Sequence, residues 1–127
     1  MRISGLHAPP SPREALRLAL IQVTDASGRA RFTTIYPGWY GQRAVHIHFK
    51  VRTNPSSGPT HEFVSQLYFD DGLTDKVHAR APYASRGKRH TRNPDDRLFR
   101  DGGDQLVLAV IPRGDGYAAV FDIALAT

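Results

Sequence analysis

The stretch PGWYGQRAVHIHF, residues 37–49, predicts a β-strand, and it also predicts to which face of the strand each side chain points. From residue 44 to 49 it is apolar except for two histidines, His46 and His48, which are spaced two residues apart. Side chains at i and i+2 of a strand point to the same face, so the two imidazoles project together while the apolar residues between them line the other face. If the apolar face belongs to the core, the histidines face a second layer or a cleft.

The composition is that of one soluble globular domain. The chain has 127 residues, of which 40% are hydrophobic and 23% charged, and it has no cysteine and a net charge of +5. No run of 18 apolar residues is present, so no membrane span is expected. The missing cysteines and the absence of a signal-peptide pattern favour a cytoplasmic protein. The basic residues are densest at 80–100, but acidic residues and prolines interrupt them, which favours an anionic small ligand over nucleic acid.

Short apolar runs separated by turn residues predict an all-β chain, folded as an antiparallel β-sandwich. A turn at 25–28 separates two runs that form a hairpin signal, and a short helix is expected over 73–79. The polar segment 85–104 is expected to be a long loop. Residues 1–20 are an atypical, partly disordered N-terminal segment, and 21–127 form the sandwich. The expected strands are 21–35, 45–51, 63–69, 106–111 and 117–124.

The histidine pair is a weak metal signal by itself, since paired strand histidines are more often half-exposed structural residues. Tyr40 strengthens it, because a Pro-Gly kink just before it can turn its phenol toward the strand face. Two imidazoles and a phenolate form a mixed nitrogen and oxygen set that suits Fe(III) better than Zn(II), Mg(II) or Ca(II).

Four segments together resemble the intradiol ring-cleavage dioxygenases, which are non-haem Fe(III) enzymes that open catechols between the two hydroxyls. The segments are VTDASGRARFTTIYPGWYGQRAVHIHFKV, HEFVSQLYFDDGLTDKV, DGGDQLVLAVI and GYAAVFDIAL, within residues 21–125. The ordered combination of PGWY, RxxHIH and QLYF is far more specific than HxH alone.

The resemblance implies a role for each matching residue. Tyr40 matches a tyrosinate ligand of Fe(III), and His46 and His48 match the two histidine ligands. Arg43 matches an arginine that stabilises negative charge on the substrate, and Gln66 matches a glutamine of the substrate pocket. The resemblance also implies a small aromatic diol and O2 as substrates, with muconate-type products.

One departure from the family pattern concerns the other tyrosinate ligand, which the family carries upstream in a D-x-x-G-x-Y pattern. No tyrosine precedes Thr24, and the only loose candidate elsewhere is Tyr83. Activity is therefore expected to be weakened, and the alternative is a non-catalytic family member that binds a small aromatic or a stray metal. A missing upstream strand would expose a sheet edge, so we also expect a homodimer, with residues 1–20 packed across the partner.

Overall fold

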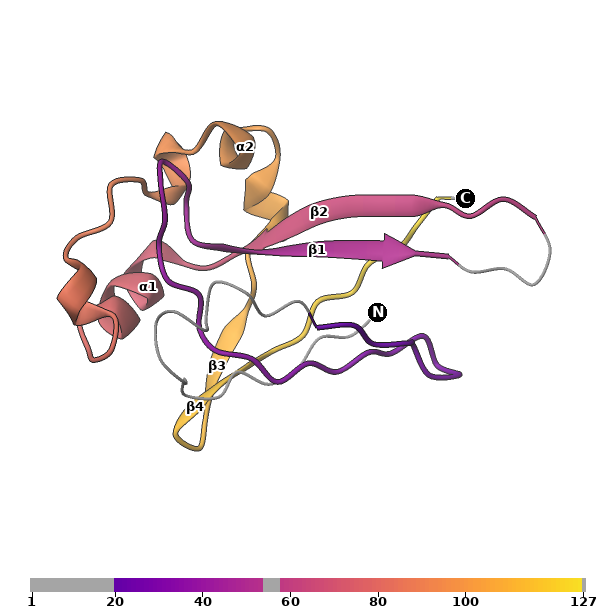
Figure 1. Ribbon diagram of the computed structural model, residues 1–127, viewed down its shortest axis with the longest axis horizontal. Coiled ribbons are helices and arrows are strands. Elements are labelled where there is room, and N and C mark those ends of the chain that lie inside the picture. Colours follow the sequence, from indigo (N-terminus) through magenta and orange to yellow (C-terminus); the bar gives the residue numbers. More distant parts are fainter. Residues whose placement is uncertain (1–19, 54–57, 127) are drawn as a thin grey trace.

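The computed structural model describes residues 20–53 and 58–126, and it confirms a chain built mainly of antiparallel strands. Two hairpins form two separate two-stranded sheets (Figure 1). The strands are β1 (His46–Arg52), β2 (Glu62–Tyr68), β3 (Val110–Arg113) and β4 (Gly116–Ala119). The expectations for residues 1–19 lie outside the described residues. The closure of the two sheets into a sandwich stays a prediction.

The helical segments are short and lie at one end of the molecule (Figure 1). The helix expected at 73–79 is present, but it begins two residues earlier because the Asp70 carboxylate accepts a hydrogen bond from the Leu73 N–H, 2.9 Å away, and caps it. None of the helices in the described ranges is long and apolar enough to cross a membrane. They are α1 (Asp71–His78), η2 (Ala84–Arg86), η3 (Asn93–Asp95), α2 (Arg97–Arg100) and η4 (Gly103–Leu106).

Three sequence expectations differ from the structure in detail. The segment 85–104 is not a simple loop, since η3, α2 and parts of η2 and η4 lie within it. Residues 21–35 keep the expected turn, in which the Asp25 N–H donates to the Arg29 carbonyl at 2.9 Å, but they carry only an isolated bridge at Thr34. The strand expected at 106–111 is shifted, since Leu106 belongs to η4 and β3 covers Val110–Arg113, and the strand expected at 117–124 ends at Ala119. Alternation of apolar residues matches the exposure pattern along β1, but residues 21–29 are all exposed, because strand pairing also needs a partner at hydrogen-bonding distance.

The core lies between the two hairpins. Its buried members come from five separate parts of the chain, which explains why no single motif marks it. Ile47 and Phe49 of β1 pack against this cluster, so the apolar face of β1 is the core face, as the alternation predicted. The buried cluster consists of Tyr36, Val45, Leu67, Phe69, Leu108 and Ala119.

Candidate metal centre

The other face of the β1–β2 hairpin carries both histidines. The strands pair so that His46 lies opposite Tyr68 and His48 lies opposite Gln66. Directly opposite residues of an antiparallel pair share a face, so all four side chains project to the same side. His46 is buried and His48 is exposed, which places the pair at a boundary between the interior and solvent.

The His46 ring is held in one orientation by the backbone. Its Nδ1 lies 2.7 Å from the Ala44 carbonyl oxygen, a contact in which Nδ1 carries the proton and donates it. Burial lowers the pKa of His46, and the nearby Arg43 charge lowers it further. The hydrogen bond to the Ala44 carbonyl raises the pKa but does not cancel these effects. A neutral ring with its Nε2 lone pair free is the form in which histidine binds a transition metal.

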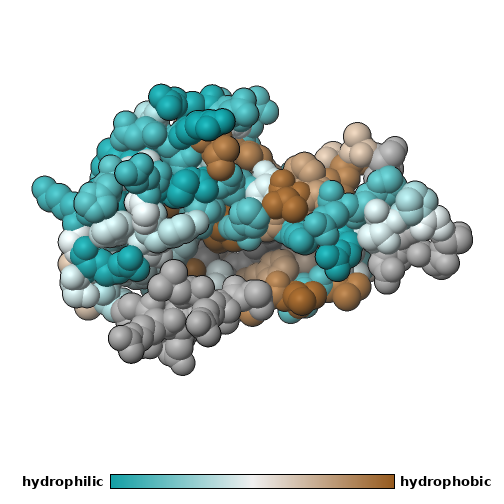
Figure 2. All heavy atoms as spheres, turned by 45° about the horizontal axis from the view of Figure 1, so that its top comes forward, coloured by the Kyte–Doolittle hydropathy of each residue, from teal (hydrophilic) through white to brown (hydrophobic). Residues whose placement is uncertain are grey.

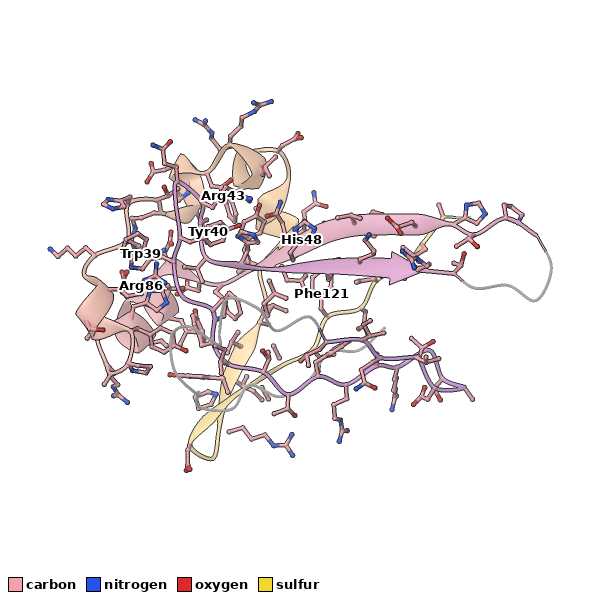
Figure 3. All side chains as sticks on the ribbon, in the orientation of Figure 1. Trp39, Tyr40, Arg43, His48, Arg86 and Phe121 are labelled. Carbon is pink, nitrogen blue, oxygen red and sulfur yellow. The ribbon has the colours of Figure 1, made fainter. Side chains whose placement is uncertain are left out.

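Tyr40 reaches this face from the turn that precedes β1. Gly41 has a φ of +52°, a conformation that other residues rarely adopt, and the turn closes when the Arg43 N–H donates to the Tyr40 carbonyl at 3.4 Å. The Tyr40 ring lies 5.9 Å from the His46 ring, centroid to centroid, and is half exposed. Figure 3 shows Tyr40, Arg43 and His48 gathered around the first half of β1, and Phe121 on the core side.

Arg43 and Gln66, the two residues expected in the substrate pocket, contact each other. The Arg43 Nη2 donates to the Gln66 Oε1 at 2.5 Å, and the Arg43 Nε donates to the Asp96 Oδ2 at 2.9 Å. Asp96 and Gln66 thus hold the guanidinium from two sides. Gln66 lies opposite His48, so the guanidinium lies close to the histidine face.

Asp96 is a contact of Arg43 that no sequence motif indicated. It is 1% exposed and lies 53 positions from Arg43 in the chain. Its signal was local: an aspartate directly before the short run Arg97–Arg100 is typical of a helix N-cap, and Asp96 does accept hydrogen bonds from the Leu98 and Phe99 N–H groups. Burial alone would raise the pKa of Asp96, but hydrogen bonds from Ala44, Arg43 and the helix hold it below the ordinary value.

The structure places Tyr83 away from the histidine face. Its hydroxyl donates to the Tyr36 carbonyl at 2.5 Å, and its ring stacks on His78 with centroids 5.1 Å apart. Tyr83 is therefore used in the packing of α1. The second phenol on the histidine face belongs to Tyr68, whose hydroxyl is buried and makes no hydrogen bond within the described residues.

The fold and this geometry can be compared with solved structures. An intradiol ring-cleavage dioxygenase from Tetranychus urticae matches with a TM-score of 0.55 and 24% identity over 66% of this chain. A second dioxygenase crystal structure matches with a TM-score of 0.53 and 25% identity over 62% of the chain. The chain shares its fold with intradiol ring-cleavage dioxygenases. It spans 40% and 37% of the lengths of these two structures. No known family model and no curated protein matches the sequence.

Within this dioxygenase-like fold, the expected site residues are partly gathered. The structure brings Tyr40 beside His46 and Arg43 beside Gln66, and it puts His48 on the same face. Among residues 20–53 and 58–126, no three His, Cys, Asp or Glu side chains are grouped so that they could hold a metal ion. A metal on this face would therefore need an oxygen ligand of another kind, such as a phenol, in addition to the imidazoles.

Proposed function

We propose that the chain is a non-haem Fe(III) intradiol dioxygenase or the corresponding part of one, acting on catechol-type aromatic diols. The reaction adds both atoms of O2 to the ring carbons that carry the hydroxyls and breaks the bond between these carbons, which gives a muconate-type dicarboxylic acid. The observation that carries the proposal is the placement of Tyr40, His46 and His48 beside an Arg43–Gln66 pair on one hairpin face of this fold.

The donor set fits ferric iron. Tyr40 would supply a hard anionic oxygen, and His46 and His48 would supply neutral nitrogens. The His46 contact to the Ala44 carbonyl supports this assignment, because a second hydrogen bond of this kind commonly orients metal-binding histidines. Bound Fe(III) would act as a Lewis acid toward the diol and accept electron density from it.

The protein side chains would supply charge and orientation. Arg43 carries a permanent positive charge on a planar fork, and it would face the oxygen on which negative charge develops. Gln66 fixes one end of that fork, and its free amide N–H groups would donate to the substrate. His46 is shielded from solvent, so the inner part of the site excludes water better than the outer part near His48 and Tyr40.

A second candidate is a non-catalytic binder of small aromatics or of a stray metal. One observation favours it: on the described part of this face, Tyr40 is the phenol beside the histidines with its ring half exposed, while the Tyr68 hydroxyl is buried beneath the surface. A single phenolate leaves a bound ferric ion with one protein negative charge, which holds it less firmly than two would.

Catechol-dependent O2 uptake by the Fe(III)-loaded chain, followed by ultraviolet detection of the muconate product, separates the two candidates. The dioxygenase proposal expects one O2 consumed per product formed, and loss of both signals in His48→Ala. His61→Ala is the matched control, because His61 is exposed and lies outside the site. Catechol binding without O2 uptake would support the non-catalytic binder instead.

A further inference from the structure

The guanidinium of Arg43 is directed by a residue from a distant part of the chain. Asp96 accepts from the Arg43 Nε, and Gln66 accepts from its Nη2. These two contacts use adjacent edges of the planar fork and leave Nη1 with no hydrogen bond among the described residues. The side chain is 27% exposed, so part of the fork still faces the outside of the protein.

Asp96 is itself fixed by a full set of hydrogen bonds. Its Oδ2 also accepts the Ala44 N–H at 2.7 Å, and its Oδ1 accepts the Leu98 N–H at 2.8 Å and the Phe99 N–H at 3.2 Å. The carboxylate therefore ties the first turn of α2 to the residue that follows Arg43 and to Arg43 itself. Four donors fix the orientation of this buried carboxylate. The carboxylate in turn fixes the orientation of the arginine side chain that is hydrogen-bonded to it.

We propose that Asp96 is a positioning residue of the site, which holds Arg43 so that its free Nη1 edge meets the anionic oxygen of a catecholate. The proposal rests on the function proposed above, because it assumes an anionic ligand on the His46–His48 face. Asp96 touches no ligand in this account, and it acts through Arg43 alone.

Asparagine tests this role because it keeps the shape of the side chain and removes its charge. Its amide oxygen can accept on one side, but its NH2 group would face two N–H donors on the other. In Asp96→Asn, either Arg43 and Ala44 or the first turn of α2 lose their acceptor. Asp104→Asn is the matched control, since Asp104 is exposed and makes no side-chain hydrogen bond within the described residues.

The experiment is a double-mutant cycle on catechol affinity. Fe(III)-loaded wild type, Asp96→Asn, Arg43→Gln and the double variant are titrated with catechol by visible absorption, and iron per chain is measured for each. We expect each single variant to bind catechol about tenfold more weakly, in line with the loss of one charge-assisted hydrogen bond. The double variant should be no weaker than Arg43→Gln, and iron content should not change.

The outcomes separate this inference from the proposed function. Wild-type affinity in Asp96→Asn would overturn the positioning role, and so would losses that multiply in the double variant, because Asp96 would then act independently of Arg43. A wild-type protein that holds iron but binds no catechol would contradict the proposed function, and the positioning role with it.

A second variant covers the case in which Asp96→Asn does not fold, as judged by circular dichroism. Arg43→Lys keeps the positive charge but cannot contact Asp96 and Gln66 through a planar fork. We expect it to lose as much catechol affinity as Arg43→Gln. Wild-type affinity in Arg43→Lys would overturn the proposal, since charge without orientation would then suffice.

Discussion

At the scale of single residues, two buried tyrosines differ in one hydrogen bond. The Tyr36 hydroxyl lies 2.7 Å from the Thr74 hydroxyl, whereas the Tyr68 hydroxyl is buried without a hydrogen bond among the described residues. Burial and the Asp96 charge raise the pKa of Tyr68, and the nearby Arg43 guanidinium opposes them through its charge and its closeness to the hydroxyl. Tyr68 therefore stays a neutral phenol at the edge of the site, and its desolvation is compensated less fully than that of Tyr36.

This difference predicts opposite responses to the same substitution. Tyr68→Phe should leave the free energy of unfolding unchanged or raise it by about 1 kcal/mol, because it removes a polar group with no partner. Tyr36→Phe should lower it by about 1 kcal/mol, because it leaves the Thr74 hydroxyl without that contact. Urea unfolding of both variants measures the two values. A loss in Tyr68→Phe as large as that in Tyr36→Phe would contradict this account of the Tyr68 hydroxyl.

The residues of the site differ in how far the sequence could predict them. His46 and His48 share a face, as the two-residue spacing predicted, because strand geometry is local. The Arg43–Gln66 contact depends on the pairing of β1 with β2, so only the family resemblance pointed to it. Asp96 was missed because its contact with Arg43 is set by tertiary packing, to which no local pattern corresponds.

At the scale of elements, α1 ends on a histidine that the fold keeps neutral. The Nε2 of His78 lies 3.0 Å from the Pro37 carbonyl, its ring stacks on Tyr83, and its Nδ1 is buried without a partner in the described ranges. Burial lowers the pKa of His78 from its ordinary value of 6.5, and the Pro37 contact only partly opposes this. The contacts tie the end of α1 to the segment that leads into the Tyr40 turn.

These contacts predict a pH-dependent stability. Because the folded pKa of His78 is the lower one, the unfolded chain binds more protons below pH 6.5, so stability is full above that pH and falls as the pH drops toward 5. His46 adds to the same slope, since its pKa is also lowered. Urea unfolding from pH 7 to pH 5 should show the decline, and His78→Gln should make it shallower.

The control is His61→Gln, which changes an exposed histidine directly before β2. It should leave the pH slope as in the wild type. An unchanged slope in His78→Gln would show that the end of α1 does not contribute to this dependence.

The sequence predicted the elements best where hydrophobic alternation and turn chemistry agreed. β1 has both, and its exposure alternates along its length as expected. The segment 85–104 shows neither hydrophobic alternation nor clear turn chemistry. Its helical turns are too short to show the helical repeat of apolar residues, and Asp96 alone marked the start of α2. Residues 21–35 alternate well but find little pairing among the described residues, since alternation does not specify a partner strand.

At the scale of the whole molecule, the two ends differ in surface character. In Figure 2 the end with the helices is covered mainly by hydrophilic side chains, and hydrophobic ones gather toward the hairpin and the first described segment. Ile21 and Val23 are each 90% exposed, and Phe63, which lies on the same face of the hairpin as Phe49, is exposed as well. Large apolar side chains this exposed often contact another surface.

We therefore predict that the chain forms homodimers through this apolar end. Replacing the exposed pair Ile21 and Val23 with charges, as in Ile21→Glu/Val23→Lys, should shift the mass measured by light scattering from dimer to monomer and leave the fold intact by circular dichroism. The matched control, Arg97→Glu/Arg100→Glu, changes exposed residues of α2 at the hydrophilic end and should remain dimeric. A wild-type chain that is monomeric at high concentration would contradict the prediction.

The proposed metal centre requires that Tyr40, His46 and His48 together hold ferric iron. A phenolate bound to Fe(III) gives a visible charge-transfer band, so the colour of the iron-loaded chain reports on Tyr40 directly. With one phenolate identified, we expect iron occupancy to be partial as purified and to rise when catechol is added.

The most direct test is the visible absorption spectrum and the iron content of the Fe(III)-loaded 127-residue chain, measured for the wild type, Tyr40→Phe and Tyr83→Phe. We expect a reddish protein whose band disappears in Tyr40→Phe and persists in Tyr83→Phe, because the Tyr83 hydroxyl is bound to the Tyr36 carbonyl. The same band in Tyr40→Phe as in the wild type, or a wild-type chain that binds no iron even with catechol present, would contradict this expectation.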